Sequence, residues 1–206
     1  MKIGLMAITG LLTVPALLAA EIDSRTIHDY SFIGVGYGYL HEVGPDLNAH
    51  GGVAELSFEE QNFVLGVGGG YFWGDEDIPD VELWNVSASL GYVIRMAENH
   101  LNIIPRFGGG YGEVDVETSG PFGSASFTEE SWSLLPGVTL SYAINNRFAI
   151  SGGYTFAYNL DAEEEAHLFS AGAKFAILEQ VALAAGAVFS DDDGFEGFTA
   201  GVEFHF

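Results

Sequence analysis

The chain has 206 residues, with 28 glycines, 14% aromatic residues and no cysteine. The lack of cysteine excludes a disulfide framework and a thiolate metal site, and the formal net charge of −23 argues against binding nucleic acid or anionic lipid without divalent cations. No central run reaches the roughly 18 apolar residues that a membrane-spanning helix needs, so any membrane span beyond the N-terminus must consist of strands.

The N-terminus has the pattern of a secretory signal peptide. Lys2 precedes an apolar run over residues 3–18, and the small pair Ala19 and Ala20 is followed at once by polar residues. We predict a signal peptide over residues 1–20, cut after Ala20, and one domain over residues 21–206. The alternative is an uncleaved inner-membrane anchor.

From Ser31 onward, large apolar residues alternate with small or polar ones. Alternation with period 2 indicates strands, because successive strand side chains point to opposite faces. The segments are about ten residues long, which is the length of a tilted membrane-spanning strand. The sequence therefore predicts ten strands, over residues 33–39, 54–59, 63–73, 84–96, 101–112, 132–142, 148–158, 169–175, 181–190 and 197–206.

The connections between the predicted strands alternate in length. Short turns follow the second, fourth, sixth and eighth strands, and longer links follow the others, the longest being residues 113–128 with Gly120 and Pro121. Five up-and-down hairpins fit this pattern, which is typical of a barrel with short periplasmic turns and longer extracellular loops. Pro105 and Pro136 fall inside strands, and we expect a β-bulge at each because proline cannot donate to the ladder.

In each predicted strand, the large apolar side chains share one face and the glycine, serine and alanine residues share the other. Ten strands offer too many bulky side chains for the interior of a soluble ligand-binding barrel, so we predict that the bulky face meets lipid. Aromatic residues support this orientation because they gather near both ends of the strands, as at two membrane interfaces. The predicted loop-end girdle contains Tyr39, Tyr71, Trp73, Trp84, Tyr111, Trp132 and Tyr158, and the turn-end girdle contains Phe58, Phe63, Tyr92, Tyr142, Phe148, Phe175 and Phe206.

The last strand ends the chain with an apolar face made by Phe198, Ala200, Val202, Phe204 and Phe206. Together with the signal peptide, the alternating strands and the short turns, it resembles the broad family of small outer-membrane β-barrel proteins, including opacity-type and OmpA-type barrels. The resemblance implies an all-β, closed, antiparallel up-and-down transmembrane barrel of ten strands, or alternatively eight, in the outer membrane of a Gram-negative bacterium.

The resemblance also implies the partners of the chain. Outer-membrane lipid and lipopolysaccharide would surround the barrel, and the barrel-assembly machinery would recognise the terminal Phe206. We expect a monomer and no nucleic-acid partner.

Seven ionisable residues have inward parity and lie in the half of the lumen nearer the turns. Opposite charges should pair there, because an isolated ion in a narrow lumen is costly. The predicted ion-pair plug contains Glu55, Glu59, Arg95, Arg106, Lys174, Glu203 and His205. Such a plug would close the barrel, and the alternative is a narrow cation-preferring porin. Nearer the loops, the inward positions include glycines such as Gly36 and Gly38. These glycines could leave a cavity in the lumen, or they could simply allow the strands to bend.

The predicted loops contain no lysine or arginine and form an acidic crown. The simplest interpretation is a solvated surface, and the sharper one is loose binding of Ca²⁺ or Mg²⁺ by carboxylate oxygens, with the metal itself unknown. The candidate ligands are Asp75, Glu76, Asp77, Glu163, Glu164, Glu165, Asp191, Asp192 and Asp193. Their spacing lacks the alternate acidic positions of an EF-hand loop, and no other cofactor is expected.

An outer-membrane hydrolase is the competing class of function. Omptin-type proteases also have ten strands and use rim carboxylates with a histidine, and His41, His50 and His167 fall near the predicted rim. Those proteases have much longer strands and loops, and lipid A deacylases place serine two residues after histidine, where this chain has Phe169. We therefore predict a non-enzymatic protein with a structural or surface-interaction role, and a protease or lipid A-modifying hydrolase is the alternative.

Overall fold

The computed structural model describes residues 30–44, 47–74, 80–96, 100–120, 123–191 and 194–206. The predicted signal peptide, residues 1–20, and the lead to residue 29 lie outside the described residues. The strands are β1 (Phe32–Gly44), β2 (Leu47–Glu60), β3 (Phe63–Gly74), β4 (Asp80–Tyr92), β5 (Ile94–Met96), β6 (Leu101–Gly120), β7 (Gly123–Leu134), β8 (Gly137–Asn145), β9 (Phe148–Asn159), β10 (Glu164–Leu178), β11 (Val181–Ser190) and β12 (Gly194–His205).

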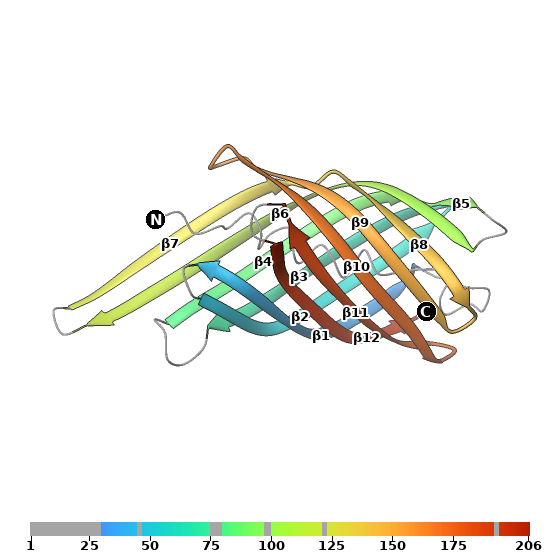
Figure 1. Ribbon diagram of the computed structural model, residues 1–206, viewed down its shortest axis with the longest axis horizontal. Helices are drawn as coiled ribbons and strands as arrows, with labels where there is room; N and C mark the ends of the chain where they lie inside the picture. Colours follow the sequence, from blue (N-terminus) through green and yellow to red (C-terminus); the bar gives the residue numbers. More distant parts are fainter. Residues whose placement is uncertain (1–29, 45–46, 75–79, 97–99, 121–122, 192–193) are drawn as a thin grey trace.

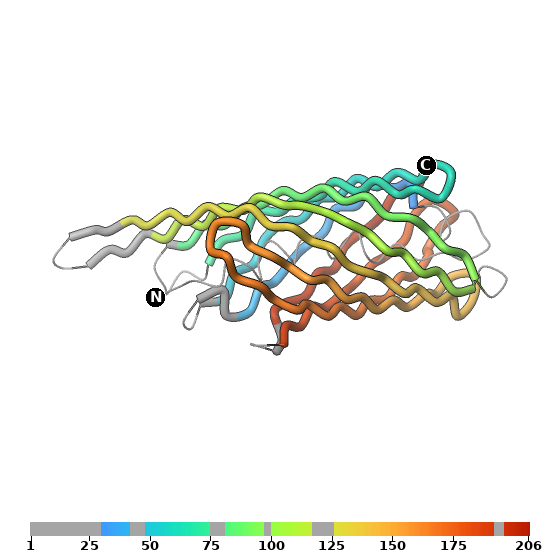
Figure 2. Tube along the Cα trace, turned by 90° about the horizontal axis from the view of Figure 1, so that it is seen from above, coloured from blue at the N-terminus to red at the C-terminus, as the bar shows by residue number. Residues whose placement is uncertain are grey.

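These strands form one closed antiparallel barrel, seen from two sides in Figures 1 and 2. The first strand pairs with the last, from Phe32 opposite His205 to Leu40 opposite Gly197, so the sheet has no edge along this seam. β4 with β5, and β7 with β8, each make one strand of the barrel, because β6 pairs with all four. The prediction of a 10-strand up-and-down barrel is therefore confirmed, rather than the alternative of eight.

The two prolines interrupt strands without changing their register. Ile94 pairs with Ile103 and Gly91 with Arg106, which keeps one register across Pro105. The register on the other side of β6 also continues across Pro136, whose carbonyl accepts a hydrogen bond from the N–H of Phe156 at 2.9 Å. The predicted bulges at Pro105 and Pro136 are therefore wrong. Each proline lacks the N–H that would bond to the neighbouring strand. The strand opposite Pro105 is therefore divided at Val93 into β4 and β5, and the strand that contains Pro136 is divided into β7 and β8.

The segment predicted as the longest loop is mostly strand. β6 is 20 residues long, and its pairing with β7 continues to Gly120 opposite Gly123. Residues 113–120 and 123–128 are thus paired strands of a long hairpin, and the prediction of a loop over them is wrong. Figure 2 shows the hairpin projecting past the ends of the other strands, on the side opposite the C-terminus.

The large apolar side chains point outward, as predicted. Phe107 is 58% exposed and Leu90 is 53% exposed, while the alternate residues of β4, such as Asn85, Ser87 and Gly91, are buried and face the lumen. A lumen lined by small and polar side chains under an apolar exterior is typical of membrane barrels. Within the described residues, no helix is long and apolar enough to cross a membrane.

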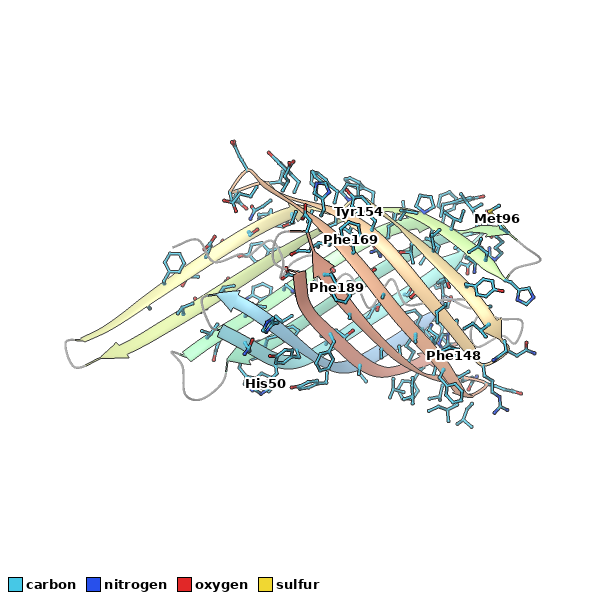
Figure 3. The ribbon with its side chains drawn as sticks, in the orientation of Figure 1. His50, Met96, Phe148, Tyr154, Phe169 and Phe189 are labelled. Atoms are coloured by element: carbon cyan, nitrogen blue, oxygen red, sulfur yellow. The ribbon has the colours of Figure 1, made fainter. Side chains whose placement is uncertain are left out.

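Aromatic rings make contact in rows on the outer surface. Near the loop end, the ring of Tyr111 lies 5.3 Å from that of Trp84 and 5.0 Å from that of Trp132. Near the turn end, the rings of Phe63 and Tyr92 lie 5.0 Å apart. Figure 3 shows outward side chains in both zones, with His50 toward the loop end and Phe148 and Met96 toward the turn end.

Candidate functional site: the lumen of the barrel

One ion-paired group lies beside the seam where the barrel closes. Lys174 on β10 is only 1% exposed, and its Nζ lies 2.5 Å from Oε2 of Glu203 on β12. The same oxygen lies 3.2 Å from Nε2 of His205. Lys174 also lies over the ring of Phe32 on β1, 5.1 Å from its centroid. Through its inward parity, one lysine thus contacts both strands of the closing seam.

A second ion pair lies near the turn-end rim. The guanidinium of Arg95 on β5 lies 2.5 Å from Oε1 of Glu59 on β2 and also donates to the side chain of Asn62 in the intervening turn. The backbone N–H of Glu59 donates to the hydroxyl of Ser31 at 3.1 Å. These bonds connect Ser31, just before β1, to β2, and connect β2 to β5.

Glu55 and Arg106 also lie in the lumen, but no salt bridge joins them to the other described residues. Glu55 is buried, and its Oε1 has no hydrogen-bond partner among the described residues. It lines a cavity of about 40 Å³ with Thr199 and Glu203, while Arg106 lines a second cavity of about 20 Å³ with Tyr30. A water molecule needs about 10–15 Å³ of such space, so each cavity has room for very few. Ion pairs thus join five of the seven candidate plug residues into two groups. Glu55 and Arg106 make no salt bridge, but their charges interact with each other, and the charge of Glu55 also interacts with those of Lys174 and Glu203.

An apolar layer accompanies the charges at the turn end. Tyr30, Phe32, Val93 and Ile104 are buried and pack together inside the barrel. The hydroxyl of Tyr30, just before β1, accepts a hydrogen bond from the side chain of Asn102 at 3.3 Å. Burial raises the pKa of Tyr30 above its ordinary value of 10.0, so this hydroxyl stays protonated.

A second apolar cluster fills the lumen nearer the loops, where the sequence suggested either a cavity or bent strands. We call it the stopper. Its buried members are Leu40, Ala49, Phe72, Val81, Leu83, Val114, Leu135, Ala157, Leu168 and Val188. They come from strands all around the barrel, so the cluster crosses the lumen rather than lining one wall.

The space beside one inward glycine shows how the stopper is filled. A Cβ atom placed on Gly38 would lie 2.8 Å from Cε1 of Phe72, which is itself fully buried. The phenyl ring therefore occupies the volume that the glycine leaves. The sequence alone could have indicated that Phe72 points into the lumen, because it stands between the outward residues Tyr71 and Trp73.

The histidines that suggested a hydrolase occupy other surroundings. His50 lies on the outer surface, its ring 5.1 Å from that of Trp73. Nδ1 of His167 lies 2.7 Å from the hydroxyl of Tyr154, and His41 contacts the side chain of Asn48 at 2.9 Å. His50 and His167 thus belong to the aromatic rows at the loop end. Their positions in the alternating pattern of β2 and β10 could have indicated that both side chains point outward.

The acidic candidates for cation binding are only partly described. Asp75, Glu76, Asp77, Asp192 and Asp193 lie outside the described residues. Glu163, Glu164, Glu165 and Asp191 lie in or beside the links at the loop end, and Oδ1 of Asp191 accepts the backbone N–H of His167 at 3.1 Å. In the part of the chain that the structure describes, no three acidic, histidine or cysteine side chains gather closely enough to hold a metal ion.

No protein-family model matches this chain, and no curated protein is significantly similar to it. Among solved structures, the translocator domain of the autotransporter NalP from Neisseria meningitidis is similar, with 12% identity, a TM-score of 0.47, and coverage of 85% of this chain and 88% of that chain. The NanC porin has 11% identity, a TM-score of 0.49, and coverage of 85% and 100%. Ail, the attachment invasion locus protein of Yersinia pestis, has 17% identity, a TM-score of 0.43, and coverage of 85% and 97%. These values assign neither a family nor a function, and the fold rests on the strand pairing of the chain itself.

Proposed function

We propose that this chain is a non-enzymatic outer-membrane β-barrel protein of a Gram-negative bacterium, with a lumen that does not conduct and a structural or surface-interaction role. The observation that carries the proposal is the filling of the lumen at two levels. The stopper closes it toward the loops, and the ion-paired groups with the Tyr30 and Phe32 layer close it toward the turns.

The exterior supports a membrane location. Large apolar side chains such as Ile33, Leu65 and Phe107 are about half exposed all along the strands, which is costly in water but favourable against acyl chains. The rows of aromatic rings near both ends match the amphipathic belts of a membrane interface. A closed barrel also satisfies its backbone hydrogen bonds without water, as a lipid environment demands.

The filled lumen separates this proposal from the narrow cation-preferring porin. Conduction needs a continuous wet path, and the cavities beside Glu55 and Arg106 measure only about 40 and 20 Å³. Single-channel recording in planar bilayers tests this directly. We expect no discrete conductance from the refolded protein or from an Arg106→Ala variant, which widens the smaller cavity but leaves the stopper in place. Steady unit conductance from the native protein would favour the porin instead.

The end of the chain supports an assembly signal. Phe206 is 61% exposed at the turn end, and its backbone N–H donates to the carbonyl of Ser31 at 3.2 Å, which fixes the terminus beside the start of the barrel. The ring is therefore available to the assembly machinery while the backbone already closes the seam.

Loose binding of Ca²⁺ or Mg²⁺ by the acidic links at the loop end is a further part of the proposed function. Calorimetry that detects no binding of either ion at millimolar concentration would refute the proposed cation binding.

A further inference from the structure

The hairpin of β6 and β7 has one backbone edge that the barrel does not cover. Beside β9, the edge of β7 is paired only at Ser133 and Leu134. The next contacts are at Trp132, whose carbonyl accepts the N–H of Leu160 at 2.8 Å and whose N–H donates to Oδ2 of Asp161 at 2.7 Å. Beyond Trp132, the described part of β7 pairs with β6 on its other side alone. In Figure 1 this portion of the hairpin extends past β9 and β10.

Backbone geometry shows which groups this edge presents. In an antiparallel pair, the N–H and C=O of one residue point to the same side of the strand, and the side alternates along the chain. Because both groups of Trp132 point away from β6, those of Glu130, Thr128 and Ser126 do so too. Three N–H groups and three carbonyls therefore face outward in a row, an arrangement that accepts an additional strand.

The charge around this edge selects what can pair with it. Glu113, Asp115, Glu129 and Glu130 lie in the projecting strands, and the sequence has no lysine or arginine from residue 107 to residue 146. Glu113 and Glu130 are direct cross-strand partners, so the hairpin already places two acids opposite each other. A second copy of the chain would add like charges across the new ladder, which is unfavourable. An extended segment carrying lysine or arginine at alternate positions would remove this repulsion.

We propose that the open edge of β7, from Ser126 to Glu130, is a docking site for an extended basic segment of a partner polypeptide. The segment adds to the sheet through backbone hydrogen bonds, and its basic side chains on one face lie beside Glu130 and Glu113. This deepens the proposed surface-interaction role by naming the class of partner, and it does not depend on whether the lumen conducts. A silent bilayer recording with no docking would leave the non-conducting barrel in place and remove only this inference.

Binding of a short peptide to the refolded full chain in detergent micelles tests the site. The probe is an eight-residue peptide alternating lysine and threonine, with blocked ends, and the comparison peptide carries glutamate in place of lysine. Thr128→Pro removes an outward N–H without touching the bonds between β7 and β6. Thr128→Val is the matched control, because it keeps that N–H and loses only the hydroxyl that donates to Asp115 at 2.5 Å.

We expect saturable binding of the lysine peptide, at least tenfold weaker binding by Thr128→Pro, and a change below twofold for Thr128→Val. Amide hydrogen exchange of the native chain gives a readout that needs no variant. The peptide should slow exchange at Ser126, Thr128 and Glu130 at least tenfold and leave Phe127 and Glu129 unchanged. Equal binding by Thr128→Pro, absent binding of the lysine peptide, or no alternating protection would overturn the proposal. Protection of the same amides by self-association without peptide would assign the edge to a second copy instead.

Discussion

Lys174 shows how one side chain can support a barrel from within. Its ammonium contacts Glu203 on the closing strand and the ring of Phe32 on the opening strand, and it is almost fully buried. Removing one partner of a buried ion pair leaves the other charge uncompensated, which costs far more than the net contribution of the pair. The stability of the seam should therefore depend on this lysine.

We expect Lys174→Met to lower the free energy of unfolding by about 3–5 kcal/mol, because Glu203 loses its buried countercharge. Urea unfolding in lipid vesicles measures the change. Arg147→Met is the control, since Arg147 is exposed in the turn between β8 and β9 and its loss should change stability by less than about 0.5 kcal/mol. The double variant Lys174→Met with Glu203→Gln should recover at least half of the loss. Equal stability of the two single variants would contradict this account of the seam.

Gly38 and Phe72 form a second residue-level test. Gly38→Ala should destabilise the barrel by roughly 1–3 kcal/mol, because the new methyl group overlaps the buried ring of Phe72. Gly52→Ala is the matched control, since a Cβ there meets nothing within 4 Å. Adding Phe72→Leu to Gly38→Ala should cost less than the two separate effects combined, because the smaller side chain relieves the overlap. Additive costs in a double-mutant cycle would show that the two residues do not share this space.

At the scale of the strands, alternation in the sequence predicted which face of each strand is bulky, because that face depends only on residue parity. It did not predict which residues of different strands meet at one level of the lumen, because that depends on strand register. Phe72, Leu83 and Leu135 therefore went unnoticed as members of the stopper. The extra length of β6 and β7 was also missed, since Gly120, Pro121 and the surrounding acids are typical of a loop.

The projecting part of the hairpin should be dispensable for the barrel. Replacing residues 117–126 with Asn-Gly would join the cross-strand partners Val116 and Phe127 by a two-residue turn of a favoured type. We expect the urea midpoint of unfolding to stay within experimental error, because Val114 and Val116 keep their places at the stopper. Binding of the lysine peptide should weaken without being lost in the same variant, because Ser126 is removed while Thr128 and Glu130 keep their unpaired backbone groups. A shift of the midpoint comparable to that of Lys174→Met would mean that the hairpin stabilises the barrel.

At the scale of the whole molecule, the three tryptophans of the chain report the depth of the barrel in a membrane. Trp73, Trp84 and Trp132 all lie on the outer face near the loop end. In vesicles with nitroxide-labelled lipids, a label near the headgroup should quench their fluorescence at least twice as strongly as a label at the end of the acyl chain. Quenching that is stronger for the deep label, or absent for both, would contradict the proposed placement in the bilayer.

The distribution of basic residues gives the molecule two chemically different ends. Of the basic residues that the structure describes, Arg106 and Lys174 point into the lumen and Arg95 and Arg147 lie at the turn end; the sequence places no basic residue in the links at the loop end. Trypsin cleaves after lysine and arginine, so on an intact cell it would find no site in the links at the loop end. A glutamate-specific protease would instead reach Glu129 and Glu130, and digestion of whole cells with the two enzymes would reveal which way the barrel is inserted.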